Sequence, residues 1–146
     1  MMIKVKIVAP VKGTEDPEKV KKAILNLFMV DKNKIELIKD NHESRIAIVA
    51  EGKDVLLPFF DAIRYDRIID SARRILKRNQ VGNTTFFYIS KEAAFVKHVN
   101  FTEEGQEPLG AIFVTIISDE LDRVIKWLTP KTKDGKIIET IDLNDD

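Results

Sequence analysis

The chain has 146 residues, a length that suits a single domain with a sizeable core, and we expect residues 1–146 to form one. Its 24 basic and 24 acidic side chains cancel, which excludes a general attraction to nucleic acid or membranes, so a site for a polyanion must be local. It has no cysteine, which excludes disulfides, thiolate metal sites and thiol nucleophiles and favours a cytoplasmic location. No run of apolar residues is long enough to span a bilayer.

The first part of the chain predicts a strand followed by a helix. Residues 3–9 alternate apolar and charged side chains, the period-two pattern of a strand with one wet face. Pro10 should close this strand or lie at a sheet edge, because proline cannot donate a hydrogen bond to a ladder. Asp16 is a predicted N-cap and Pro17 a first helical residue. The apolar residues that follow at helical spacing are Val20, Ala23, Ile24 and Leu27.

A hairpin and a broken helix are expected next. Residues 35–39 and 45–50 are strand-like runs joined by a short polar link, which favours an antiparallel hairpin. The helical region after them changes its apolar face partway, because residues 56–63 and 65–76 place their apolar side chains on nearly opposite sides. We therefore predict a short helix, a break near Arg64 and a longer helix.

The longer helix concentrates positive charge on one side. Its apolar side holds Tyr65, Ile68, Ile69, Ala72, Ile75 and Leu76. Its other side holds Arg67, Asp70, Arg74 and Arg78, with Lys77 beside them. Asn79 and Gly82 should stop the helix, because glycine enters a left-handed cap at the least cost. The β-branched and aromatic residues 84–89 then predict a strand.

The last third of the chain predicts short elements and one apolar strand. Residues 91–96 have the pattern of a helical turn or a short helix, and residues 109–117 form the most apolar strand candidate in the chain. Ser118 is a predicted cap for a helix over 119–128. The segment 131–146 is expected either to add an edge strand or to fray.

The order of these elements predicts an α+β fold of two layers. Short hairpin links favour a mainly antiparallel sheet, with helices packed on one of its faces. The other face of the sheet is then left open or pairs with a partner.

A search for catalytic and metal chemistry gives no constellation. His42 and His98 each lie among charged residues near a predicted strand end, with no metal-ligand spacing to carboxylates. The acidic cluster at 119–122 suits a helix N-terminus, where the dipole favours negative charge. The glycines form no phosphate-binding loop. We therefore expect no catalytic residue, no cofactor and no metal, and a protein that is not an enzyme.

The basic helix has two interpretations. In the first, its cations form a solvated face relieved by Asp66 and Asp70 through pairs three and four residues apart. In the second, Arg74, Lys77 and Arg78 outnumber the nearby acids at the helix end and bind an A-form RNA duplex through phosphates and 2′-hydroxyls. Hydrogen-bonding side chains suited to the same task follow at Asn79, Gln80, Asn83 and Thr84.

The aromatic strand raises the question of base stacking. Phe86 and Tyr88 share one side of the strand and Phe87 takes the other, because adjacent residues point to opposite faces. We expect at least two of the three to pack in the core. A stacking platform would need them on an uncovered sheet face, with basic and glycine neighbours that this strand lacks.

A resemblance to a known family lies in residues 14–28, 90–101 and 108–110. These segments resemble a small archaeal family of uncharacterised proteins that are predicted to bind RNA. The similarity covers nearly the whole chain. Separately, the high content of Lys, Glu and Ile is typical of heat-adapted proteins. Glu92 and Lys97 depart from the family pattern. The resemblance implies a fold like that of the large-subunit ribosomal protein that holds 5S ribosomal RNA, which is related to double-stranded-RNA-binding domains.

Two hypotheses for function follow. The first is a cytoplasmic protein that binds structured RNA by its backbone and shape. Its predicted contacts are Arg67, Arg74, Lys77, Arg78, Asn79, Lys91 and Lys97. The alternative is a protein–protein interaction or homodimerisation module without catalytic activity. A contiguous apolar outer sheet face would favour the partner protein, and a polar face with a separate basic ridge would favour RNA.

Overall fold

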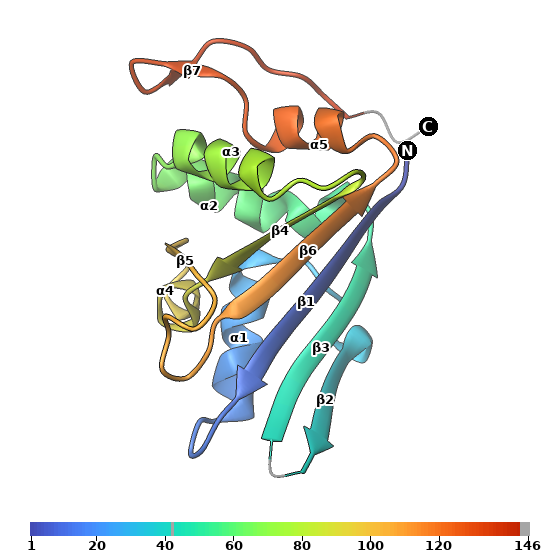
Figure 1. Ribbon diagram of the computed structural model, residues 1–146, viewed down its shortest axis with the longest axis vertical. Helices are drawn as coiled ribbons and strands as arrows, with labels where there is room; N and C mark the ends of the chain where they lie inside the picture. The colour runs from blue at the N-terminus through green and yellow to red at the C-terminus, as the bar shows by residue number, and fades with distance from the viewer. Residues whose placement is uncertain (42, 144–146) are drawn as a thin grey trace.

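The computed structural model describes residues 1–41 and 43–143, and these form a six-stranded antiparallel sheet with five α-helices packed on it (Figure 1). The strands lie side by side in the order β2-β3-β1-β6-β4-β5. Their bounds are β1 (Ile3–Val11), β2 (Ile35–Asp40), β3 (Glu43–Glu51), β4 (Thr84–Ile89), β5 (Phe101–Thr102) and β6 (Ile112–Ser118). The α+β class predicted from the sequence is confirmed.

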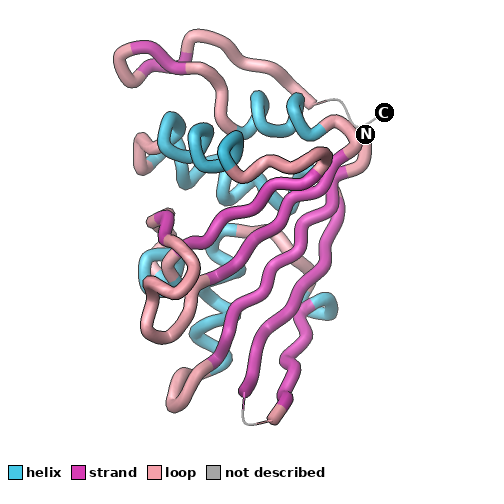
Figure 2. The backbone as a smooth tube through the Cα atoms, in the orientation of Figure 1, coloured by secondary structure: helices cyan, strands magenta, loops and turns pink. Residues whose placement is uncertain are grey.

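The helices follow the predicted sites closely. Their bounds are α1 (Pro17–Leu27), α2 (Leu57–Tyr65), α3 (Ile69–Arg78), α4 (Lys91–Phe95) and α5 (Leu121–Leu128), with 3₁₀ turns η1 (Lys32–Lys34) and η2 (Lys53–Leu56). The carboxylate of Asp16 accepts a hydrogen bond from the backbone N–H of Glu18 at 2.9 Å, which confirms the predicted N-cap of α1. Figure 2 shows α1 behind the strands, while α2, α3 and α5 lie across the upper end of the sheet.

β1 is a central strand, flanked by β3 and β6. Ile7 pairs with Ile48 of β3 and with Val114 of β6, and all three side chains are buried on the helical side of the sheet. Pro10 was predicted to close β1 or to lie at an edge; it is the penultimate residue of the strand, opposite Arg45 of β3 and unpaired on the side of β6. This is tolerated because the ladder between β1 and β6 stops at Val8, before Pro10, so the missing N–H removes no pairing there.

The predicted break between the second and third helices is confirmed. α2 ends at Tyr65, α3 begins at Ile69, and Arg67 between them has a positive φ of 58°. Tyr65 was expected on the apolar side of the longer helix, but it belongs to α2 and is 81% exposed. The break reorients the chain after Tyr65, so the periodicity of α3 does not extend back to it.

Arg64 fastens the end of α2 to the end of α5. Its guanidinium donates to the carbonyl oxygens of Phe60 (3.0 Å), Leu128 (3.0 Å) and Trp127 (3.3 Å) and lies 3.3 Å from the centroid of the Phe60 ring. Burial lowers the pKa of Arg64 to about 10, against the opposing charge of Asp61. This arginine therefore has a structural role in closing the helical layer.

Within the described residues, the C-terminal segment does not add an edge strand to the main sheet. β7 (Thr132–Lys133) and β8 (Lys136–Ile137) pair with each other in a separate small hairpin. Beyond them Leu143 is 1% exposed, and its carbonyl oxygen accepts a hydrogen bond from Lys53 Nζ at 3.0 Å. Burial of Leu143 holds the segment against the body. Residues 144–146 of the predicted tail, like His42, lie outside the described residues.

The outer face of the sheet carries two of the three aromatic residues of β4. Phe87 is fully buried, whereas Phe86 and Tyr88 point to the outer face and are half-buried. There they contact Phe113 of β6, with ring centroids 5.8 and 4.8 Å away. The expectation that at least two of the three pack in the core is therefore wrong, because β4 lies near the edge of a sheet whose helices cover the opposite face.

Candidate nucleic-acid interface

An open groove of about 760 Å³ lies between α3 and the sheet edge formed by β4 and β5. Its first wall, from α3 and its end, consists of Ser71, Arg74, Ile75, Arg78 and Asn79. Its floor consists of Phe86, Phe87, Tyr88 and Phe101. Its second wall, from β5 and the loop after it, consists of Thr102, Glu103, Glu104 and Gln106. Three segments separated in sequence thus build one surface.

Two hydrogen bonds fix the end of α3 against β4. The buried Thr85 hydroxyl donates to the carbonyl oxygen of Leu76 at 2.6 Å, which satisfies a helix-end acceptor. The side-chain amide of Asn79 donates to the carbonyl oxygen of Phe86 at 2.9 Å. With α3 held in this way, Arg74 and Arg78, four residues apart, share one face of the helix and line the groove.

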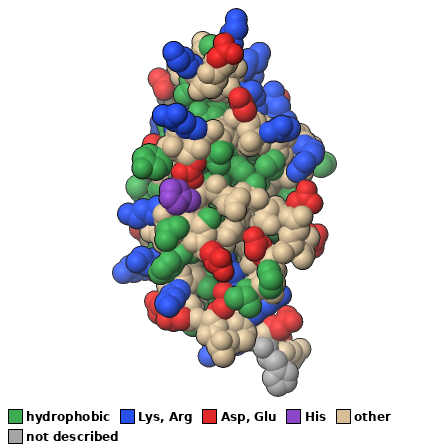
Figure 3. Space-filling view, turned by 90° about the vertical axis from the view of Figure 1, so that its left-hand side faces the viewer, with side chains coloured by type: hydrophobic (Ala, Val, Ile, Leu, Met, Phe, Trp, Pro, Cys, Tyr) green, Lys and Arg blue, Asp and Glu red, His purple; other side chains and the backbone are tan. Residues whose placement is uncertain are grey.

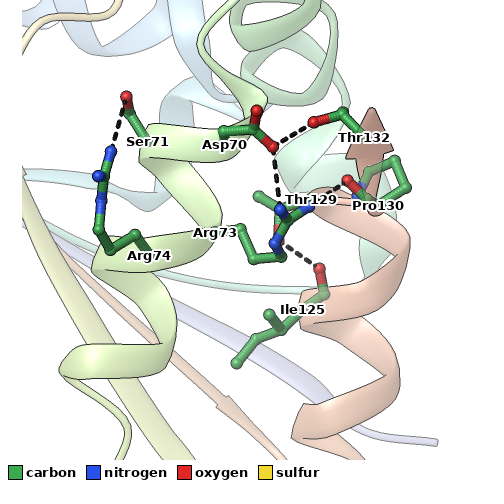
Figure 4. Close-up of polar contacts among 8 residues, drawn as sticks. All are labelled: Asp70, Ser71, Arg73, Arg74, Ile125, Thr129, Pro130 and Thr132. Carbon is green, nitrogen blue, oxygen red and sulfur yellow. Dashed lines mark hydrogen bonds and ion pairs between the residues drawn. The ribbon is translucent and has the colours of Figure 1, made fainter. Parts of the chain in front are cut away.

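The opposite side of α3 is occupied by packing contacts (Figure 4). Arg73 donates to the Asp70 carboxylate at 2.9 Å and to the carbonyl oxygen of Pro130 at 2.6 Å, and Thr132 also donates to Asp70. Arg74 points away from this network, and its guanidinium donates to the Ser71 hydroxyl at 3.3 Å. Arg73 therefore belongs to the contact with α5, and Arg74 belongs to the groove.

Of the two acids expected to neutralise the basic helix, one pairs with a cation of the helix and the other pairs elsewhere. Asp70 pairs with Arg73. Asp66 lies 2.8 Å from His98 Nδ1 and accepts a hydrogen bond from the backbone N–H of Val99 at 2.9 Å. Among the described residues, no carboxylate lies within 4.0 Å of the charged groups of the exposed Arg74, Lys77 or Arg78. The solvated-face interpretation thus keeps one pair that it assumed, Asp70 with Arg73, and lacks such pairs for Arg74, Lys77 and Arg78.

The other predicted basic contacts do not line the groove. Lys77 borders a small hollow of about 60 Å³ against α5, together with Lys126, Lys131 and other residues. Arg67 lines a separate hollow of about 590 Å³ beneath the β7–β8 hairpin. Lys97 is exposed just after α4, with a positive φ of 67°. Of the predicted set, the groove brings together Arg74, Arg78 and Asn79.

Lys91, one of the predicted RNA contacts, is a buried structural residue in this fold. Its side chain is 8% exposed, and its ammonium donates to the Glu15 carboxylate at 2.8 Å. The same ammonium donates to the carbonyl oxygens of Pro10 at 2.9 Å and Leu109 at 2.5 Å. All three donors of the ammonium are satisfied within the protein, because α4 begins where β1 ends and β6 approaches.

The sequence did not predict the negative charge of the second wall, which Glu103 and Glu104 supply and which we call the acidic wall. Glu103 and Glu104 are separated from the aromatic strand by α4 and β5, and they gave only the signal of a polar loop. In the structure, burial raises the pKa of the Tyr88 phenol, and the nearby negative charge of Glu104 raises it further. Glu104 therefore lies near enough to Tyr88 for its negative charge to act on the phenol.

Figure 3 shows the side of the molecule on which β5 and α4 lie, with apolar side chains between basic ones at the upper right and acidic ones below. Among the described residues, no group of three His, Asp or Glu side chains is placed to hold a metal ion. No helix in the same part of the chain has the length and apolar character needed to cross a bilayer.

Comparison with known proteins identifies the family. A family model described as RNA binding matches residues 4–118, a range that contains every residue of the groove. A UPF0201 protein of Methanothermobacter thermautotrophicus is 42% identical over 88% of this chain and 92% of its own, and one of Methanopyrus kandleri is 35% identical over 94% and 91%. The crystal structure of a UPF0201 protein from Methanococcus jannaschii superimposes with a TM-score of 0.77 at 39% identity, covering 93% of this chain and 99% of that one. The chain therefore belongs to the family described as RNA binding, together with these archaeal UPF0201 proteins.

Proposed function

We propose that this protein binds structured RNA without catalysing a reaction, and that Arg74 and Arg78 bind the phosphates. The observation that carries the proposal is their shared position on the groove wall, exposed and with no carboxylate within 4.0 Å among the described residues. Arginine guanidinium groups bind phosphate oxygens through two parallel hydrogen bonds. The family match supports the same partner.

The remaining predicted contacts take different places in this proposal. Lys77, Arg67 and Lys97 are exposed but do not line the groove, so none of them is assigned a phosphate in it. Asn79 holds the floor strand, and Lys91 is buried, so neither is assigned a phosphate. The likeness to the ribosomal protein that holds 5S RNA stays a prediction.

The test is a salt series of binding affinities for an RNA hairpin, measured by fluorescence anisotropy. Arg74→Gln/Arg78→Gln is compared with wild type and with Lys32→Gln/Lys34→Gln, which removes the same charge from the exposed turn η1 beside the opposite sheet edge. We expect the log–log salt slope to fall by about 0.7–0.9 for each phosphate that the arginine variant no longer binds, and to stay constant in the lysine variant. Equal slopes in all three proteins, or no binding tighter than about 10⁻⁴ M at physiological salt, would contradict the proposal.

One observation favours homodimerisation as a second candidate function. The outer sheet face exposes Val49 of β3 by 51%, and on β4 and β6 it places Phe86, Tyr88 and Phe113 in contact with one another. Lys6 of β1 and Thr115 of β6 lie between Val49 and Phe86 in the register of the sheet. Such a face can bury against a second copy of the chain. Analytical ultracentrifugation of wild type and Val49→Lys would show a dimer that the substitution dissociates. A monomer in both cases would remove this candidate.

A further inference from the structure

The two walls of the groove carry opposite charge. Arg74 and Arg78 lie on the helical wall, and Glu103 and Glu104 lie on the loop wall. Among the described residues no ion pair joins the walls, so each remains available to a ligand. A phosphate backbone filling the whole groove would bring its negative charge against the two glutamates. A single ligand therefore suits this groove only if it is anionic on one side and offers hydrogen-bond donors on the other.

Phe86 and Tyr88 of β4 line the groove between the charged walls, with their side chains on the outer face of the sheet. Phe86 and Tyr88 have centroids 6.2 Å apart at an interplanar angle of 83°, and both are half-buried. Rings of this kind provide stacking surfaces for nucleobases, because every base has a flat π-face. The volume of about 760 Å³ also lies within the range of ligand pockets, about 300–1,000 Å³. The floor is therefore suited to a flat heterocycle between the phosphate wall and the acidic wall.

Resting on the proposed RNA binding, we propose that the groove holds one unpaired nucleotide of a structured RNA and prefers a base that carries an amino group. The phosphate lies at Arg74 and Arg78, and the base stacks on Phe86 or Tyr88. The edge of the base reaches Glu103 and Glu104, whose carboxylates accept hydrogen bonds from the amino group. Bases in loops and bulges are free to enter such a site, whereas bases in a duplex are stacked and paired.

The acidic wall gives this proposal its specificity. Cytosine offers an amino group to a carboxylate, whereas uracil has a carbonyl oxygen at the same place and would set oxygen against oxygen. The two bases have nearly the same size, so stacking alone does not separate them. A preference for cytosine over uracil thus reports on Glu103 and Glu104.

The experiment uses hairpins that share one stem and differ only in their loops, one with cytosines and one with uracils, together with the blunt stem duplex. We expect wild type to bind the cytosine loop at least about fivefold more tightly than the uracil loop, the low end of base discrimination by paired hydrogen bonds. Glu103→Gln/Glu104→Gln should reduce this ratio to near one, because a glutamine amide can donate to uracil as well as accept from cytosine. Both glutamates are exposed, so this variant keeps its fold.

A second variant tests the floor. Phe86→Leu should weaken both loop hairpins by about fivefold or more while leaving the blunt duplex unchanged. Equal affinity for both loops and the duplex, with loss of binding in Arg74→Gln/Arg78→Gln, would overturn the nucleotide site and leave RNA binding by the helix intact. Absence of binding to all three RNAs would overturn the proposed function and this inference together.

Discussion

The side-chain amide of Asn79 donates to the main-chain carbonyl oxygen of Phe86 at 2.9 Å, across the turn that joins α3 to β4. This contact lies on an incompletely covered edge, because β5 pairs with β4 only at Tyr88 and Ile89. The amide thus takes the place of a strand partner for one exposed acceptor. It also sets the distance between the basic wall of the groove and its aromatic floor.

Asn79→Asp should destabilise the protein by about 1–2 kcal/mol, because the carboxylate cannot donate to the Phe86 carbonyl. Urea unfolding followed by circular dichroism gives the free energy of unfolding, and Asn83→Asp serves as a control in the same exposed turn. At a temperature where the variant is folded, RNA affinity should change only through the added negative charge. Unchanged stability would show that solvent satisfies the carbonyl equally well.

Gly110→Ala should destabilise the protein by about 2 kcal/mol more than Gly105→Ala. Both glycines have a φ of 81° and lie in the same connection between β5 and β6, so the backbone strain is matched. A methyl group at Gly110 would overlap Pro10 Cγ, whereas one at Gly105 would meet nothing within 4 Å. Thermal and urea unfolding of both variants separates the effect of overlap from the effect of φ. Equal losses would mean that Pro10 moves aside at little cost.

Lys91→Met should lower the free energy of unfolding by about 3 kcal/mol, the lower end of the range for breaking a buried ion pair. The substitution leaves the Glu15 carboxylate and two carbonyl oxygens without their donor. Lys19→Met, at an exposed position of α1, is the control and should change stability by less than about 0.5 kcal/mol. A near-neutral Lys91→Met would show that the methionine packs well enough to replace the pair.

The Tyr88 phenol should titrate above its usual pKa of 10. The chain has two tyrosines, so the absorbance of tyrosinate in a Tyr65→Phe background reports on Tyr88 alone. Glu104→Gln should lower the pKa of Tyr88 only partly, because burial is the larger cause of the shift. Glu92→Gln is the control. If Tyr88 titrates in Glu104→Gln at the same pH as in the Tyr65→Phe background, then the charge of Glu104 does not act on the phenol.

The same shift has a consequence for stability. Between the unfolded pKa of about 10 and the higher folded value, the folded state keeps a proton that the unfolded state has lost. The contribution of Tyr88 is therefore fully present below pH 10 and is lost as the pH rises through the folded pKa. Tyr88→Phe should remove this part of the pH dependence.

The local elements could be predicted because their causes are local. β4 has the bounds given by its β-branched and aromatic run, and α1 begins at the predicted cap and proline. The break between α2 and α3 followed from two apolar stripes that one straight helix could not bury together. Each of these depends on residues within a few turns of the chain.

The site could be predicted only in part, because its remaining determinants are distant in sequence. Lys91 looked like one more exposed cation, yet its partners Pro10 and Glu15 lie 81 and 76 residues away. Asp66 looked like a helix neutraliser, but the fold brings it to His98. The opposing wall at Glu103 and Glu104 is set by the short pairing of β4 with β5, which no local period predicts.

The position of β1 between β3 and β6 also shapes how the protein is made. During synthesis β1 can pair with β3 once residue 51 has left the ribosome, but its other edge stays open until residues 112–118 emerge. For that interval the nascent chain carries an unpaired edge of alternating apolar residues, the kind of edge that invites association with other chains. Closure must then join the first strand of this sheet in the sequence to the last, a pairing of high sequence separation that slows folding. β1, a central strand of the finished sheet, therefore stays unpaired on one edge until β6 has been synthesised.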